Sequence, residues 1–169
     1  MNQHQENHTS RSPPAGSLSR PRAAGRIVAV CISAGGIPKT PVPSAHLDFA
    51  GFAGDGHEHE KHIRPDRAVL IQDEERLEEF RREGFALAPG SLGENLTVRG
   101  LNVQGMAPGT RLRIEDGPLL ELSEPRRPCF VLDQIDPRLQ SVVAGRCGYL
   151  ARVVEPGSAS AGKRICAVD

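Results

Sequence analysis

The residue with the most chemistry to offer is a cysteine placed just after two arginines. Cys129 ends the segment Pro125-Arg126-Arg127-Pro128-Cys129. Guanidinium groups close to a thiol favour the thiolate, the form that ligates metals and attacks electrophiles. The prolines keep this segment out of a helix, so we expect a stiff loop or strand end. The pattern fits a site for an anionic, thiophilic ligand, and it equally fits a buried structural cysteine beside two surface arginines.

Two loops offer further polar side chains to such a site. Lys39 lies in a loop with two glycines and two prolines, where it is either an ordinary exposed lysine or a cation presented to an anion such as phosphate. His57 directly follows the turn at residues 54–56. Together with His59 and His62 it suggests zinc, but neither a strand nor a helix brings all three to one face. We therefore retain only His57 as a candidate.

A polar pair and three other cysteines complete the candidates. Glu94 and Asn95 follow a glycine, where they either organise a buried loop or reflect ordinary turn chemistry. Cys31 and Cys166 lie in apolar, strand-like segments and are interpreted as structural. Cys147 follows the end of a predicted helix and is the one rival of Cys129.

Length and composition limit the class of protein. A chain of 169 residues fits one domain, and its 18 glycines and 14 prolines indicate many turns and short strands. A net charge of +0 and an aromatic content of 4% argue against nucleic-acid binding. No apolar run is long enough to span a membrane. Without a signal peptide or a C-x-x-C pair, we expect a cytoplasmic chain with reduced thiols.

Residues 1–25 are polar and predicted to be a disordered tail, and residues 26–169 are predicted to form the folded domain. Hydrophobic patterning predicts one helix after an Asp73 N-cap, stopped by Gly84, and a second after Asp136. The Asp116-Gly117 pair predicts a hairpin, so the Cys129 loop should leave the end of that hairpin. Strands are expected at or near residues 26–32, 46–52, 68–71, 101–103, 111–115, 119–123, 149–154 and 164–168.

Five segments, at residues 35–39, 51–57, 66–69, 89–96 and 125–129, carry a resemblance to a known family. In order, they resemble those of the MOSC domain, named for the C-terminal domain of molybdenum cofactor sulfurases. The resemblance implies a mostly β fold, a MOSC-type β-barrel with a few short α-helices. The chain is similar to stand-alone bacterial members, without the pyridoxal-phosphate domain of true sulfurases or the iron–sulfur domain of some relatives.

The resemblance also implies a cofactor. It is the molybdenum cofactor (molybdopterin), a phosphate-bearing pterin dithiolene that holds molybdenum. Cys129 occupies the position of the family's cysteine and would ligate molybdenum or carry sulfur, in keeping with the affinity of thiolates for soft metals. The other candidates are four cations for an anion-binding rim and two side chains for pocket hydrogen bonds: Lys39, Arg67, Arg126, Arg127, His57 and Asn95.

The leading functional prediction is an oxidoreductase acting on a small molecule, since family relatives reduce N-hydroxylated compounds such as hydroxylaminopurines and amidoximes. Electrons would come from a separate electron-transfer reductase, because the chain has no C-x-x-C cluster and no G-x-G-x-x-G motif. One alternative is a sulfur or cofactor carrier, with a Cys129 persulfide loaded by a sulfur donor. The other is a barrel that serves only as an interaction module.

Overall fold

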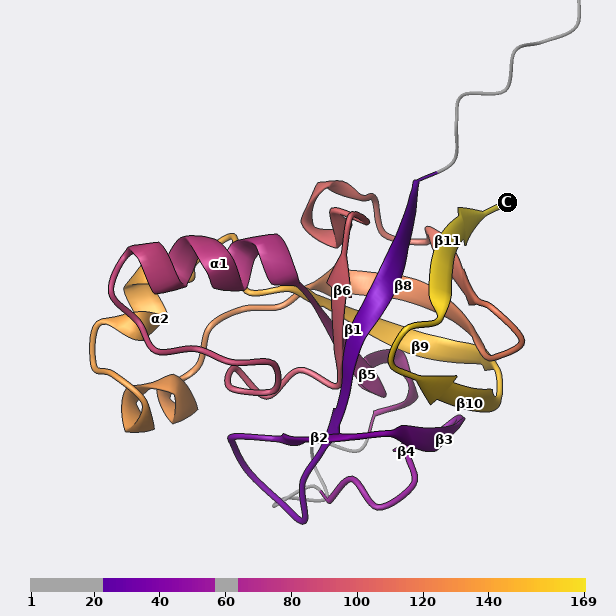
Figure 1. The fold of residues 1–169 in the computed structure, drawn as a ribbon, viewed down its shortest axis with the longest axis horizontal. Helices are drawn as coiled ribbons and strands as arrows, with labels where there is room; N and C mark the ends of the chain where they lie inside the picture. The colour runs from indigo at the N-terminus through magenta and orange to yellow at the C-terminus, as the bar shows by residue number, and fades with distance from the viewer. Residues whose placement is uncertain (1–22, 57–63) are drawn as a thin grey trace, which may run out of the picture.

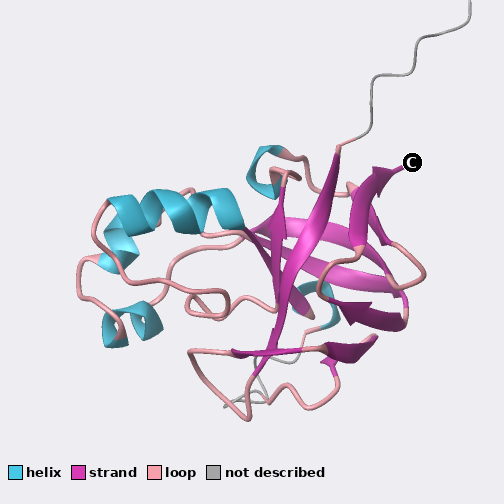
Figure 2. Ribbon diagram, viewed as in Figure 1, coloured by secondary structure: helices cyan, strands magenta, loops and turns pink. Residues whose placement is uncertain are grey.

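The computed structural model describes residues 23–56 and 64–169. More of the described chain lies in strands than in helices, and the helices gather mainly at one side of the strands (Figure 2). The first strand, β1, runs from Ala24 to Ile32 and so begins before the predicted start at Arg26. Most of the predicted tail, and the histidines at positions 57, 59 and 62, lie outside the described residues.

Seven strands close into a barrel (Figure 1). Their order around the ring is β11-β7-β8-β9-β5-β6-β1, and β11 pairs back onto β1. The pair β5–β6 is parallel, and the other pairs in the ring are antiparallel. This arrangement confirms the predicted mostly β barrel. After β1, its strands are β5 (Val69–Asp73), β6 (Leu96–Arg99), β7 (Arg111–Ile114), β8 (Leu119–Pro125), β9 (Tyr149–Glu155) and β11 (Arg164–Val168).

Four short strands lie outside the ring. β2 (Thr40–Val42) pairs with β1, while β3 (Ser44–Asp48), β4 (Gly51–Phe52) and β10 (Gly157–Ser160) form a small sheet in the order β10-β3-β4. The single strand expected at 46–52 is therefore wrong, because the chain turns back before Gly51, whose φ is +124°. The loop expected after β9 contains β10, which forms by pairing with β3.

The barrel interior is filled by aliphatic side chains from every side of the ring. Val30, Ile71, Leu96, Leu112 and Ile165 are all fully buried. Burying each such side chain contributes about 1.5–3 kcal/mol relative to leaving it exposed. The alternating pattern predicted for residues 111–115 is present in β7, where Leu112 and Ile114 face the core.

Helical segments pack beside the barrel around a second apolar cluster (Figure 1). They include α1 (Glu74–Arg82), α2 (Leu139–Val142) and the 3-10 turn η4 (Phe130–Gln134). Leu77 and Phe80 of α1 meet Leu132 and Leu139 in this cluster. Both predicted helices are thus present, although the second is only 4 residues long. Two further 3-10 turns are η2 (Pro65–Arg67) and η3 (Val103–Gly105).

Asp73 precedes α1 as predicted but does not cap it with its side chain. Its carboxylate instead accepts hydrogen bonds from the backbone N–H groups of Val103 (2.9 Å) and Gln104 (3.2 Å). Burial raises the pKa of Asp73. These contacts hold η3 where a strand was expected at 101–103, and Asn102 turns the chain there with a φ of +56°. That strand prediction is therefore wrong.

Candidate functional site

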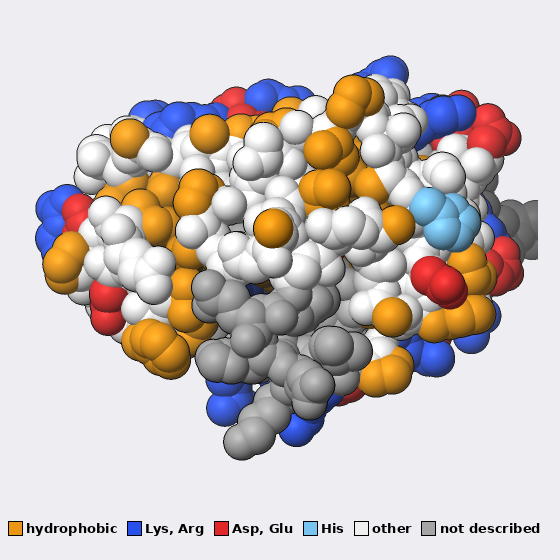
Figure 3. All heavy atoms as spheres, turned by 90° about the horizontal axis from the view of Figure 1, so that it is seen from below, with side chains coloured by type: hydrophobic (Ala, Val, Ile, Leu, Met, Phe, Trp, Pro, Cys, Tyr) orange, Lys and Arg blue, Asp and Glu red, His pale blue; other side chains and the backbone are white. Residues whose placement is uncertain are grey.

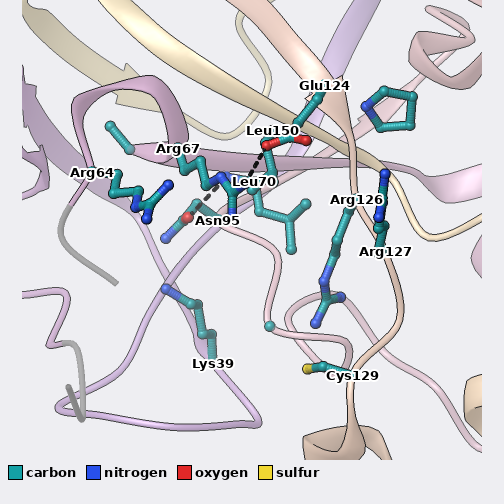
Figure 4. Close-up of a pocket in the computed structure, with 13 residues that line it drawn as sticks. Lys39, Arg64, Arg67, Leu70, Asn95, Glu124, Arg126, Arg127, Cys129 and Leu150 are labelled. Atoms are coloured by element: carbon teal, nitrogen blue, oxygen red, sulfur yellow. Dashed lines mark hydrogen bonds and ion pairs between the residues drawn. The ribbon is translucent and has the colours of Figure 1, made fainter. Parts of the chain in front are cut away.

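A pocket of about 540 Å³ opens among the loops beside the barrel (Figure 4). It brings together residues from the β1–β2 loop, η2, the start of β6 and the chain after β8. Six of the seven predicted site residues line it: Lys39, Arg67, Asn95, Arg126, Arg127 and Cys129. The seventh, His57, lies outside the described residues.

Cys129 is presented by the end of the β7–β8 hairpin, as expected. Pairing between β8 and β9 continues to Pro125, and the Arg126 N–H then donates to the Gly148 carbonyl at 3.0 Å. Cys129 has extended backbone angles (φ −135°, ψ 165°) and directly precedes η4. Its carbonyl accepts the N–H of Leu132 at 3.1 Å, so the segment is fixed on both sides of the thiol.

The four cysteines are free, and their surroundings differ. Cys129 is half-buried and lines the pocket. Cys31 is fully buried in β1, and burial raises its pKa to about 12. Cys147 is also buried, which raises its pKa. Cys166 is half-buried in β11 and does not line the pocket. Because only a thiolate ligates metal readily, Cys129 is the thiol best placed for chemistry.

The two arginines before Cys129 have different roles. Arg126 extends toward Cys129, whereas Arg127 points the opposite way (Figure 4). The Arg126 Nη1 donates to the Leu92 carbonyl at 2.6 Å and to the Cys147 sulfur at 3.4 Å. Arg127 is exposed at the rim of the pocket. One guanidinium of the pair is therefore anchored on the thiol's side.

A buried carboxylate supports the loop that anchors Arg126. Glu94 is fully buried and accepts hydrogen bonds from the N–H groups of Gly90 (2.8 Å) and Leu92 (3.1 Å). The Thr97 hydroxyl donates to the same carboxylate at 3.1 Å. Burial raises the pKa of Glu94, and the hydrogen bonds from Gly90 and Thr97 oppose that rise. Of the two sequence interpretations, the polar pair that organises a buried loop is the one observed.

Asn95 joins three segments beneath the pocket. Its Oδ1 accepts the N–H of Leu70 at 3.1 Å. Its Nδ2 donates to the Cys31 carbonyl at 3.2 Å and to the Asp55 Oδ2 at 2.7 Å. These three hydrogen bonds fix the side chain, which forms part of the pocket wall.

Lys39 is far from being an ordinary exposed lysine. Its side chain is only 12% exposed, and its Nζ forms an ion pair with Asp55, whose side chain is 2% exposed. The Asp55 Oδ1 also accepts the N–H of Ser33 at 3.0 Å. From the sequence, Asp55 was considered as a turn residue and beside the three histidines of the zinc hypothesis, but not as a partner of Lys39. Its position in the Gly54-Asp55-Gly56 turn just before His57 was the available signal.

The far side of the pocket carries a second ion pair and two further residues missed from the sequence. The Arg67 Nη2 lies 2.6 Å from the Glu124 Oε1, and both side chains are partly exposed. Arg64 also lines the pocket. Among the described residues, no hydrogen bond or ion pair involves the side chains of Arg64 and Arg127, which both line the pocket. Arg64 stands three positions before Arg67, and this spacing was the signal that could have identified it.

Within residues 23–56 and 64–169, no group of three or more His, Cys, Asp or Glu side chains is arranged to hold a bare metal ion. In the same ranges no helix is long and apolar enough to cross a membrane. A metal carried by its own organic ligand needs fewer protein donors, and a single thiolate can supply one. The pocket thus offers one soft metal ligand, the Cys129 thiol, among several cationic side chains.

Two curated relatives match most of the chain. The uncharacterized protein YflK of Bacillus subtilis (strain 168) is 32% identical over 141 residues, covering 77% of this chain and 62% of YflK. A protein named Reductase from Gibberella moniliformis (strain M3125 / FGSC 7600) is 30% identical over 127 residues, covering 70% of this chain and 23% of that protein. The chain therefore spans less than two thirds of the length of either relative.

Solved structures share the fold. The YuaD protein of Bacillus subtilis superposes with a TM-score of 0.73 at 19% identity, covering 88% of this chain and 99% of YuaD. YiiM of Escherichia coli superposes with a TM-score of 0.67 at 27% identity, covering 85% of this chain and 70% of YiiM. The barrel and its flanking helices are thus an architecture that other proteins adopt.

The family match agrees with this geometry. Residues 58–166 match the MOSC domain family, which is typically associated with binding of the molybdenum cofactor. The match includes β5 to β9, the Glu94 loop and the Cys129 segment. On this match, on the relatives and on the barrel itself, the chain belongs to the MOSC domain family.

Proposed function

We propose that this protein binds the molybdenum cofactor and reduces N-hydroxylated small molecules. The observation that carries the proposal is the half-buried Cys129 on the wall of a strongly cationic pocket. Among the described residues, five Lys and Arg side chains line the same pocket, against one glutamate. The relative named Reductase supports the class of reaction.

The pocket fits the cofactor in size and in chemistry. About 540 Å³ lies within the range of pockets that hold cofactors and drug-sized ligands. A thiolate suits a soft, thiophilic metal. Guanidinium groups suit a phosphate, which they bind through paired N–H donors. The residues present therefore match the metal end and the phosphate end of such a ligand.

The described residues would divide the work. Cys129 would hold the metal, and Arg126 would lie on the same side of the pocket. Arg64 and Arg127, which have no partner among the described side chains, would bind the phosphate. Asn95 is held rigidly and would shape the wall. When bound, the cofactor supplies a redox-active metal with a position open to the substrate oxygen.

Electrons would come from a separate electron-transfer protein. The sequence contains no C-x-x-C cluster and no G-x-G-x-x-G motif for holding a second redox group.

A carrier of sulfur or cofactor is the second candidate function. The accessibility of the Cys129 thiol favours it, because a persulfide carrier also needs a reachable thiol.

Elemental analysis and a turnover assay on the same preparation test the proposal. The full chain is made in a host that synthesises the cofactor, and its molybdenum is measured before reduction of an aromatic hydroxylamine is followed with an artificial electron donor. We expect about one molybdenum per chain and turnover, with both lost in Cys129→Ser and retained in Cys166→Ser. Cys166 is the matched control because it is half-buried and does not line the pocket.

The other outcomes separate the alternatives. Sulfane sulfur on Cys129 without molybdenum would support the carrier. Full molybdenum in Cys129→Ser would remove this thiol as the metal ligand. A wild-type chain with neither molybdenum nor sulfane sulfur would contradict both candidates and favour a barrel that serves only as an interaction module.

A further inference from the structure

We propose that Lys39 is the general acid of the reduction and that Asp55 is the residue that positions it. This inference rests on the proposed function, because the acid would protonate the oxygen that leaves an N-hydroxylated substrate. It assigns to Lys39 a role beyond that of a cation at an anion-binding rim. It also gives a function to the buried carboxylate of Asp55.

The ammonium of Lys39 is held in one place. Its Nζ pairs with Asp55. The backbone N–H of Lys39 donates to the Gly90 carbonyl at 2.9 Å, which fixes the backbone as well. Lys39 and Cys129 line the same pocket from different segments, and Lys39 extends toward Asn95 (Figure 4). An ammonium has three donors, so the pair with Asp55 leaves others for a substrate oxygen.

Asp55 is built as a fixed carboxylate. The Ser33 N–H donates to its Oδ1 at 3.0 Å, and the Asn95 Nδ2 donates to its Oδ2 at 2.7 Å, where Lys39 also binds. The side chain is 2% exposed. Three donors thus converge on this carboxylate and fix its position beside the Lys39 ammonium.

The other charged groups of the described pocket are poorly suited to give up a proton. An arginine stays protonated in proteins, which excludes Arg64, Arg67, Arg126 and Arg127 as acids. Glu124 forms an ion pair with Arg67 at 2.6 Å, so a guanidinium already occupies its carboxylate. A lysine, in contrast, can release a proton and recover it from water. Lys39 is therefore the acid that the described wall offers.

The reaction consumes two electrons and two protons: R–NH–OH + 2 e⁻ + 2 H⁺ → R–NH₂ + H₂O. The N–O bond breaks, and its bonding pair leaves with the oxygen. That oxygen takes a proton from the Lys39 Nζ and departs as water. The two electrons that reduce the nitrogen would come from an electron-transfer protein, or from a reduced viologen dye in the assay, and the bound cofactor would supply the redox chemistry. The nitrogen takes its second proton from solvent. Solvent then reprotonates Lys39.

Conservative and non-conservative changes at Lys39 test this role. Lys39→Arg keeps the positive charge but cannot donate a proton, so we expect the rate with reduced viologen to fall by about 10²–10⁴-fold while the molybdenum content is unchanged. Lys39→Ala should lose a similar factor and be rescued by methylamine, more strongly by more acidic alkylammonium ions. Asp55→Asn, which keeps the shape of the side chain, should lower kcat with molybdenum retained.

Lys163→Arg is the matched control, since Lys163 also pairs with an aspartate, Asp116, but lies outside the pocket. Its rate should equal that of the wild type. Wild-type rates in Lys39→Arg, loss of molybdenum from the Lys39 variants, or no rescue by amines would each overturn the assignment. A wild-type chain without molybdenum or turnover would instead refute the proposed function, and this inference with it.

Discussion

At the scale of the residue, burial separates the four thiols into different chemical types. Cys31 and Cys147 are buried and kept protonated, whereas Cys129 is half-buried on the pocket wall. Thiol reactivity depends on access and on the thiolate fraction. A thiol's neighbours in the fold therefore decide its role more than its neighbours in the sequence do.

This difference predicts the order of alkylation. In the native apoprotein, iodoacetamide should modify Cys129 at least about tenfold faster than Cys31 or Cys147, because both of these are buried. Peptide mapping by mass spectrometry at short reaction times measures the three rates. Equal rates for Cys129 and Cys147 would contradict the assignment of Cys129 as the accessible thiol.

Cys31 predicts a loss of stability at alkaline pH. Burial raises its pKa to about 12, above that of a thiol in the unfolded chain. Between these two values the unfolded state has released a proton that the folded state keeps, so the free energy of unfolding falls as pH rises. The slope from this group is about 1.4 kcal/mol per pH unit.

Urea unfolding at intervals from pH 8 to 11 measures this slope. Cys31→Ala should reduce it, since alanine has no proton to release. Cys147 also contributes, because burial raises its pKa in the same direction. A slope in Cys31→Ala equal to that of the wild type would show that Cys31 does not titrate in the way its burial requires.

Sequence reasoning named many of the residues that line the candidate site. The thiol, its arginines, Lys39 and Asn95 all carry recognisable side chains in short motifs, and the pocket brings them together. Asp55 was missed because its role depends on partners far away in sequence, and Arg64 because only the fold places it in the pocket lining. Asp55 acquires its role only when Ser33, Lys39 and Asn95 surround it.

At the scale of the element, two loops form the site by close approach of their backbones. Lys39 and Gly90 meet through a backbone hydrogen bond of 2.9 Å. Gly90 has a φ of +86°, and an added Cβ there would overlap the Lys39 carbonyl. The glycine thus serves both the turn and the contact that holds Lys39.

Two glycine substitutions separate these requirements. Gly84 has a similar φ of +97°, but an added Cβ would meet nothing within 4 Å. We expect Gly84→Ala to lose about 1–2 kcal/mol of stability from backbone strain alone. Gly90→Ala should lose at least about 3 kcal/mol, because it adds a clash with backbone. Denaturant titrations compare the two, and equal losses would contradict the close approach.

Local pattern was sufficient for some elements and insufficient for others. The helix at 74–82 and the hairpin at Asp116-Gly117 follow from residues adjacent in sequence, and both are present. In contrast, β10 exists because β3 lies beside it, and η3 exists because Asp73 binds its backbone. Local sequence patterns do not reveal such contacts between segments that are far apart in the chain.

At the scale of the whole molecule, closure of the ring by β11 onto β1 holds both ends of the described domain together. Ile165 in β11 is fully buried, whereas Val28 in β1 is 37% exposed. Charged side chains of both signs lie mostly around the edge of the face shown in Figure 3. Stability should therefore reside in the closed core.

This view predicts a contrast between two aliphatic residues. Ile165→Ala should lower the free energy of unfolding by about 2–5 kcal/mol, because it leaves a cavity at the seam of the barrel. Val28→Ala, on the exposed face of β1, should change it by no more than about 0.5 kcal/mol. Chemical denaturation measures both, and a loss at Ile165 as small as that at Val28 would contradict a core that is closed by β11.

The measurement that tests the central claim most directly is X-ray absorption at the molybdenum edge of the freshly isolated full chain. If Cys129 ligates the metal, the spectrum must report one more sulfur ligand on molybdenum than the dithiolene supplies. A spectrum explained by the dithiolene sulfurs alone would contradict the role of this thiol, even in a protein full of molybdenum.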